Sequence, residues 1–263
     1  SAKQQAKLFD EDKEKVKLTA GIMWHRVERE SEEMGLKAVL TSYVPASEDK
    51  VELTKIEITN LSDKVQKITP TAAVPMYARS ASNIRDHRHV TSLLHRTFTT
   101  KNGIIIYPTL TFDERGHNKN TIFYGALAKE EVNGEMISPV SFCPVTEEFI
   151  GDGGNFENPY YVAANKPLPY VAGQEVDGYE TVAAIRFEDC ELKPGETKTY
   201  VAALGYGESE ADIIELGKKY LITKHFDENL NKTKDFWQKK INVSYHSACL
   251  LYTSPSPRDG ATS

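Results

Sequence analysis

The sequence predicts a mainly β chain, in which antiparallel strands form a large sandwich and a short helical segment follows. Short β-branched or alternating runs recur roughly every ten residues between turn sequences, as is typical of antiparallel sandwiches. After Gly205 the apolar spacing changes to a helical period. A chain of 263 residues fits one such domain, because sandwiches of about 200–250 residues form single domains.

The strand pattern extends from near the start of the chain to Leu204. In the run 51–60, Val51 and Leu53 share one face, and Ile56 and Ile58 share the other, which predicts a strand inside a stack rather than at an edge. More than ten runs favour two large stacked sheets. The expected strands are 16–18, 22–30, 36–44, 51–60, 65–77, 90–100, 103–112, 121–128, 137–142, 181–187 and 198–204.

Dipeptides that accept a positive φ separate several of these strands. Asn102-Gly103 is the strongest short-range signal for a hairpin, and the same logic applies to Asn133-Gly134 and Pro194-Gly195. We therefore expect tight turns at these three places.

Two helices are expected after the strands. Ser209 to Asp212 resembles a capping box, and Ala211, Ile214, Lys218 and Leu221 recur at helical spacing. A second helix is predicted over 227–241, with an apolar stripe that includes Leu230, Phe236, Trp237 and Ile241.

Composition excludes several classes of protein. The formal charge of −6 and the pI near 5.7 argue against a nucleic-acid partner. No apolar run is long enough to span a membrane, so we expect none. The three cysteines are too few and too far apart for a disulfide framework or a zinc site, so a cytoplasmic location is expected.

The densest polar stretch consists of Arg85, Asp86, His87, Arg88 and His89. Arginine forks and tunable imidazoles suit a phosphate or the edge of a substrate, and His87 and His89 could share a metal on one face of a strand. The alternative is an interface or loop network in which Asp86 neutralises the arginines.

A second polar group comprises Asp113, Glu114, Arg115 and His117. Adjacent carboxylates on an extended chain face opposite sides, so Asp113 and Glu114 make a poor acid–base pair. The alternative is a tight turn with an internal Asp–Arg pair. Glu147-Glu148 has the same expected geometry.

A third group, which contains Asn155 and Glu157, lies in the glycine-rich stretch 149–159. A phosphate loop would need a Lys-Ser/Thr pair and a following helix, and the sequence after the glycines supplies neither. We expect either a structured loop whose aromatic and amide groups lie near a sugar, or a buried turn.

The stretches 86–96, 108–117 and 148–156, in this order, resemble the amino-terminal domain of the family 94 glycoside phosphorylases. The similarity spans about residues 21–247, and the 1,2-β-oligoglucan phosphorylases are the most similar group. The resemblance implies a large antiparallel β-supersandwich of the galactose-mutarotase type over 1–205, without its first strands. It further implies a helical linker over 206–247 toward an (α/α)₆ catalytic barrel, whereas 248–263 reads as a non-native disordered tail.

By this resemblance the parent protein performs inverting phosphorolysis of a β-glucoside to α-glucose 1-phosphate, with inorganic phosphate as co-substrate and no metal or organic cofactor. The general acid belongs to the barrel, so no residue of this chain is assigned as catalytic. The implied partners are a β-glucan oligosaccharide, the chain's own catalytic domain and a second subunit. The segments 85–89 and 113–117, with Asn155 and Glu157, are candidates for contacts at the substrate rim or at an interface.

Two other functions are considered. One is a free-standing carbohydrate-binding or mutarotase-like β module. The other is a complete hydrolase, which would need two carboxylates about 6.5–9.5 Å apart in a cleft, and the sequence offers no good pair.

Overall fold

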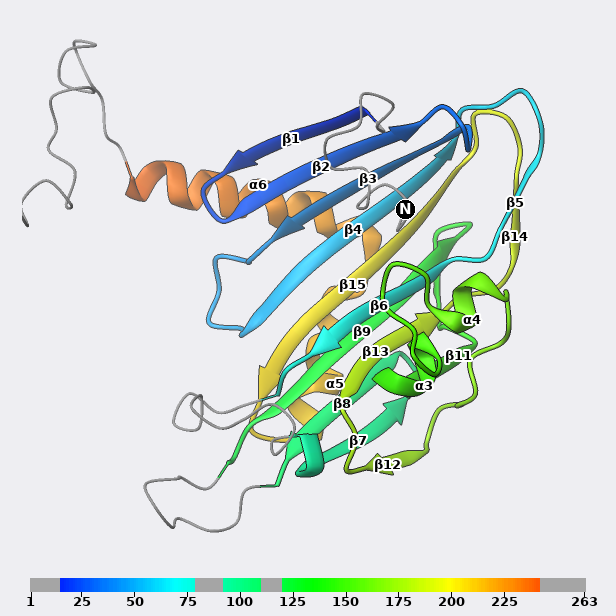
Figure 1. Ribbon diagram of the computed structural model, residues 1–263. Helices are drawn as coiled ribbons and strands as arrows, with labels where there is room; N and C mark the ends of the chain where they lie inside the picture. The colour runs from blue at the N-terminus through cyan, green and yellow to red at the C-terminus, as the bar shows by residue number, and fades with distance from the viewer. Residues whose placement is uncertain (1–14, 79–91, 110–119, 242–263) are drawn as a thin grey trace, which may run out of the picture.

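The computed structural model describes residues 15–78, 92–109 and 120–241. Antiparallel strands dominate this part of the chain, and the two longest helices come at its end (Figure 1). The strands are β1 (Lys15–Gly21), β2 (Trp24–Ser31), β3 (Leu36–Tyr43), β4 (Val51–Asn60), β5 (Gln66–Ile68), β6 (Thr71–Met76), β7 (His95–Thr100), β8 (Gly103–Pro108), β9 (Phe123–Val132), β10 (Glu135–Ile137), β11 (Ser141–Val145), β12 (Glu175–Asp177), β13 (Thr181–Arg186), β14 (Cys190–Leu192) and β15 (Thr197–Gly207). The helices are α3 (Thr146–Ile150), α4 (Tyr160–Ala163), α5 (Glu210–Tyr220) and α6 (Thr223–Lys240).

One sheet of ten strands forms the centre of the molecule, in the order β1-β2-β3-β4-β15-β9-β8-β7-β12, with β10 paired to β9. Strand β4 lies between β3 and β15, as its two apolar faces predicted. Sequence-distant strands therefore meet at the middle of the sheet, where β15 returns between β4 and β9.

Different layers cover the two faces of this sheet. On β8, Ile105 packs toward α5 and α6, whereas Ile104 and Ile106 pack toward the three-stranded sheet β11-β13-β6. This alternation follows from the two-residue period of a strand. The expectation of two large stacked sheets is wrong for the described residues, because the helices bury one face and only short strands lie on the other.

Both helices of the carboxyl-terminal segment pack on the large sheet and share its core. Gly125 and Gly205 are paired across β9 and β15, and a Cβ on Gly125 would lie 2.2 Å from Ile213 Cγ2 of α5. The absence of these side chains lets α5 approach the sheet closely. A capping box begins α5, since Ser209 Oγ accepts from Asp212 N. The helical segment is thus part of the core as well as the chain's exit from the strands.

Two of the three predicted turns are hairpins, and the expected positive φ occurs at Asn133-Gly134 but not at Asn102-Gly103. Lys101 and Asn102 join β7 to β8, and Asn133 and Gly134, with φ of 53° and 84°, join β9 to β10. The hairpin expectation is wrong at Pro194-Gly195, which is a β-turn closed by Glu196 N and Lys193 O. It connects two strands that pair in different sheets.

Several elements differ from the sequence prediction. The expected strand 65–77 is split into β5 and β6 at Pro70, where the chain leaves the ribbon β5-β14 for the three-stranded sheet. Strands β12 and β14 have three residues each, too few to show a period. Helix α6 begins at Thr223, ahead of the expected 227, because Phe226 and Leu230 form its first buried stripe.

Burial declines toward the β1 edge of the large sheet. Leu18, Val27, Leu40, Ile56 and Tyr200 form one cross-strand row. Tyr200 is 3 % exposed and Leu18 is 67 % exposed, because the three-stranded sheet covers only the middle of this face. Strand β1 is exposed along its whole length.

We expect Leu18→Lys to reduce self-association of the chain at high concentration, because a charged edge strand opposes edge-to-edge pairing. The free energy of unfolding should change by less than about 0.5 kcal/mol, since Leu18 is exposed. Sedimentation velocity and urea titration measure the two effects. If the wild-type chain self-associates and Leu18→Lys sediments in the same way, β1 does not mediate the contact between chains.

Candidate functional site: the strand-end rim

The two polar segments that carry most of the predicted site residues lie outside the described residues. Arg85, Asp86, His87, Arg88 and His89 fall within 79–91, and Asp113, Glu114, Arg115 and His117 fall within 110–119. The structure nevertheless describes the residues from which both segments leave.

These flanking residues converge at one end of the large sheet. Met76, the last residue of β6, pairs with Thr181, and Thr181 Oγ1 lies 3.3 Å from His95 Nδ1 at the start of β7. Leu94 O accepts from Thr109 N at 2.8 Å, which joins the start of β7 to the end of β8. Figure 1 shows these ends together at the lower left. We call this region the strand-end rim, namely residues 76–78, 92–95, 108–109, 120–124 and 205–207.

Asn120 fixes one side of the rim. It is 1 % exposed, and its Nδ2 donates to Pro108 O and Ile122 O, each at 2.9 Å. Tyr107 Oη donates to Asn120 O at 3.1 Å, and the Tyr107 ring stacks on Phe123 with centroids 4.3 Å apart. These contacts hold both stems of the segment 110–119 in place.

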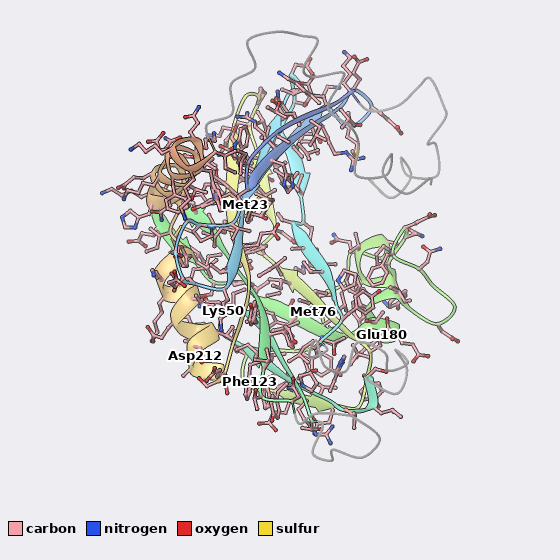
Figure 2. The ribbon with its side chains drawn as sticks, turned by 90° about the vertical axis from the view of Figure 1, so that its left-hand side faces the viewer. Met23, Lys50, Met76, Phe123, Glu180 and Asp212 are labelled. Carbon is pink, nitrogen blue, oxygen red and sulfur yellow. The ribbon has the colours of Figure 1, made fainter. Side chains whose placement is uncertain are left out.

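A hollow of about 280 Å³ opens at the rim beside Tyr77, Tyr124 and Tyr206. Met76, labelled in Figure 2, is one of the residues that line it. Tyr124 and Tyr206 are cross-strand partners with ring centroids 6.3 Å apart, and Lys50 Nζ lies 5.3 Å from the centre of the Tyr206 ring. Burial, and then the neighbouring Tyr206, raise the pKa of Tyr124, so its phenol stays protonated at neutral pH.

The pair His95-Arg96, which adjoins the polar stretch in the sequence, has structural contacts. His95 is 3 % exposed beside Thr181, and Arg96 Nε lies 3.4 Å from Asp177 Oδ2 of β12. Among the described residues, no group of three or more His, Cys, Asp or Glu side chains could hold a metal ion.

Asn155 and Glu157 lie away from the strand ends, in the connection between α3 and α4. Asn155 Oδ1 accepts from Glu157 N at 2.9 Å and from Asn158 N at 3.1 Å, which forms an Asx turn. The expected extended geometry of Glu147-Glu148 is wrong, because both residues lie in the first turn of α3. Sequence reasoning missed this helix because its five residues show no full helical period.

One short connection links the strand-end rim to the region of Asn155 and Glu157. Gly178 N donates to His95 O of the rim at 3.0 Å. Two residues further on, Glu180 O accepts from Thr146 N of α3 at 2.8 Å. The segment 178–180 therefore joins the rim to the region of α3, and the structure brings Asn155 near Glu180 and Tyr179.

The large sheet, with helices on one face and short strands on the other, defines a β-sandwich domain. The family to which this domain belongs is given by a match of the sequence to a family model. Residues 11–222 match the family model for the supersandwich domain of glycosyl hydrolase 94. The chain belongs to this family, and the expected fold class is confirmed.

Solved structures of carbohydrate-active proteins are also similar to the chain. A protein described as a kojibiose phosphorylase from the human microbiome is 10% identical, with a TM-score of 0.45 over 82% of this chain and 23% of that chain. A polysaccharide lyase is 10% identical, with a TM-score of 0.43 over 71% of this chain and 22% of that one. A protein from Escherichia coli K12 described as an aldose 1-epimerase is 8% identical, with a TM-score of 0.34 over 75% of this chain and 69% of that chain.

This chain spans less than a quarter of the length of the first two of these structures. A search of the curated proteins gives no match.

Proposed function

We propose that the chain is the amino-terminal, non-catalytic domain of an inverting β-glucan phosphorylase, most similar to the 1,2-β-oligoglucan phosphorylases. The observation that carries this proposal is the family match over residues 11–222. The parent enzyme would use inorganic phosphate as the nucleophile, and one carboxyl of an (α/α)₆ barrel would protonate the leaving oxygen.

The proposed division of the chain assigns 1–205 to the sandwich, 206–247 to the approach to the barrel and 248–263 to a non-native tail. The strand-end rim would present the segments 85–89 and 113–117 to the barrel, the substrate or a second subunit. The convergence of their described stems supports this role, because it brings two sequence-distant polar segments to one end of the sheet.

The proposed partners are a β-glucan oligosaccharide, the chain's own catalytic domain and a second subunit in a cytoplasmic homodimer, without nucleic acid, metal or organic cofactor. None of the helices in the described ranges is long and apolar enough to cross a membrane.

The tyrosine-lined hollow of the rim favours a second candidate, a free-standing carbohydrate-binding or mutarotase-like module. Sequencing the source gene beyond the codon of residue 247 separates the two candidates. A reading frame that continues into helical hairpins supports the phosphorylase, whereas a natural stop codon supports the module.

In the full-length parent, we expect Arg88→Ala to weaken phosphorolysis or dimer assembly, because a guanidinium is the strongest anion-binding group in the polar stretch. The stability of the sandwich should change little. Steady-state kinetics and sedimentation velocity provide the measurements, and a variant unchanged in both would remove Arg88 from the proposed contacts.

A further inference from the structure

A groove lies on the outer side of the three-stranded sheet, next to α3 and α4. It consists of two hollows of about 620 Å³ and about 480 Å³, which share Val145, Glu147 and Tyr179. We call it the tyrosine groove. Glu180, labelled in Figure 2, lines one of its hollows. Its combined size is that of a site for an extended ligand rather than for an ion.

Exposed aromatic rings gather in this groove. Tyr179 is 52 % exposed, Tyr160 is 43 % exposed and Phe156 is 39 % exposed, and all three line the groove. Tyr161 packs edge-on against Tyr160, with ring centroids 5.4 Å apart. Rings left open to water at this density mark a binding surface, and the flat C–H face of a pyranose packs on such rings.

Hydrogen-bonding groups lie among the rings. Glu147, Glu148 and Asp152 supply carboxylate oxygens, which accept from hydroxyl groups. Tyr170 Oη donates to Glu148 Oε2 at 3.0 Å. Burial, together with this carboxylate, raises the pKa of Tyr170 to about 12, so the phenol remains a donor at neutral pH. Glu148 is thereby held in one orientation.

The charge of the groove selects among ligands. Glutamates and an aspartate line it, and of the described residues that line it none is Lys, Arg or His. The nearby ammonium of Lys166 is held by the Tyr160 hydroxyl and lies 4.6 Å from the centre of the Tyr160 ring. An anion such as phosphate would be repelled, whereas a neutral polyol finds both apolar faces and acceptors.

The backbone fixes the groove before any ligand arrives. Gly151 ends α3 with φ of +84°, and a Cβ there would lie 2.7 Å from Tyr160 Cβ. Only glycine therefore allows α4 to lie this close to α3. Thr146 N donates to Glu180 O at 2.8 Å, which holds the Tyr179 side of the groove against the same helix.

We propose that the tyrosine groove binds a neutral oligosaccharide, whose sugar rings pack on Tyr160 and Tyr179 and whose hydroxyl groups donate to the neighbouring carboxylates. The choice of a glucan as this oligosaccharide rests on the proposed function. Through the bond between Gly178 and His95, the groove also adjoins the strand-end rim.

Isothermal titration of the 263-residue chain with a sophoro-oligosaccharide of defined length tests the proposal. We expect saturable binding that weakens by at least about tenfold in Tyr179→Ala and in Tyr160→Ala, because truncating an aromatic anchor typically costs that much. Tyr179→Phe should bind nearly as well as the wild type, since the ring remains. Phe236→Ala is the matched control, because Phe236 is 39 % exposed, close to the 43 % of Tyr160, but lies on α6.

The same titrations with cellulo- and laminari-oligosaccharides, α-glucose 1-phosphate and spermidine complete the test. Groove-dependent binding of any of these neutral sugars supports the proposal, even if the parent proves not to be a phosphorylase. Three results would overturn it: no neutral sugar binds, the sugar affinity is the same in the Tyr→Ala variants, or α-glucose 1-phosphate or spermidine binds the groove in preference. If the parent enzyme performs phosphorolysis and one of these three results is also found, the proposal for the groove fails while the proposed function stands.

Discussion

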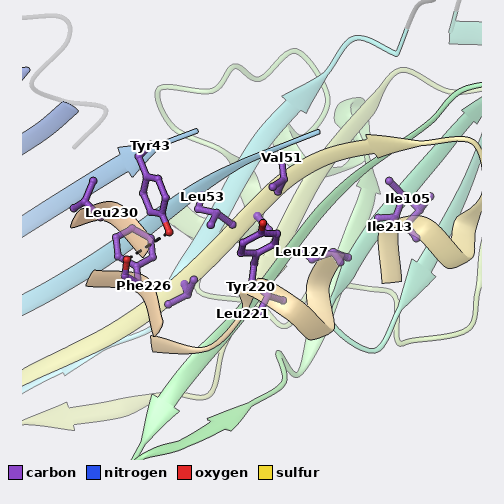
Figure 3. Packing of buried hydrophobic residues seen from close by; sticks show 12 residues of the cluster. Tyr43, Val51, Leu53, Ile105, Leu127, Ile213, Tyr220, Leu221, Phe226 and Leu230 are labelled. Carbon is purple, nitrogen blue, oxygen red and sulfur yellow. Dashed lines mark hydrogen bonds between the residues drawn. The ribbon is translucent and has the colours of Figure 1, made fainter. Parts of the chain in front are cut away.

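Phe226→Ala is expected to lower the free energy of unfolding by about 3–5 kcal/mol, because removing the ring leaves a cavity between α6 and the large sheet. Phe226 is 1 % exposed, and its ring meets Tyr43 edge-on with centroids 4.9 Å apart (Figure 3). Lys55 Nζ lies 5.4 Å from the centre of the same ring and 2.8 Å from Asp227 Oδ1. Urea titration followed by circular dichroism measures the loss.

Phe236→Ala on the same helix is the control for this effect. Its side chain is 39 % exposed, so a loss of less than about 1 kcal/mol is expected. Equal losses in the two variants would contradict the assignment of α6 to the core of the domain. Such a result would indicate that α6 does not pack on the large sheet.

Lys198→Met is expected to cost about 3–5 kcal/mol, because it leaves the buried carboxylate of Glu130 without its partner. Lys198 Nζ lies 3.0 Å from Glu130 Oε1, and the Glu130 side chain is 5% exposed. Burial disfavours the ammonium, but the hydrogen bond and the charge of Glu130 outweigh this effect and raise the pKa of Lys198 above its ordinary value of 10.5. The stabilisation is therefore fully present below that pH and is lost as the pH rises through the higher folded-state pKa.

Two further variants test the cause of this loss. The double variant Lys198→Met/Glu130→Leu should recover most of the stability, because apolar replacement of a whole buried pair is often nearly neutral. Lys67→Met should cost less than about 1 kcal/mol, since its partner Glu191 is 63% exposed and Lys67 is 83% exposed. A double variant as unstable as the single one would show that packing, rather than the unpaired charge, sets the cost.

Much of the fold follows from local sequence signals. The double apolar face of β4 predicts its place inside the sheet, and Asn102-Gly103 and Asn133-Gly134 predict their hairpins, because these signals act within a few residues. The layers do not follow in this way. That Ile104 and Ile105 face different cores depends on β15 returning between β4 and β9, a contact set by the whole chain.

For the candidate sites too, the motifs can be recognised in the sequence, whereas their positions relative to one another depend on the tertiary fold. The polar stretches 85–89 and 113–117 stand out as dense motifs, but their common origin at the strand-end rim depends on pairings such as Met76 with Thr181. Tyr160 begins α4 and Tyr179 follows β12, so only the tertiary fold brings them into one groove. The Tyr160-Tyr161 pair after Pro159 was the available sequence signal.

The most direct test of the family-based function is to express the intact gene from the same source and to assay release of sugar 1-phosphate in phosphate buffer. The substrates are sophoro-oligosaccharides, cellobiose, laminaribiose and chitobiose. We predict release of α-glucose 1-phosphate from sophoro-oligosaccharides that requires phosphate. Release of free glucose in the absence of phosphate, or no product from any of these substrates, would contradict the proposed phosphorylase.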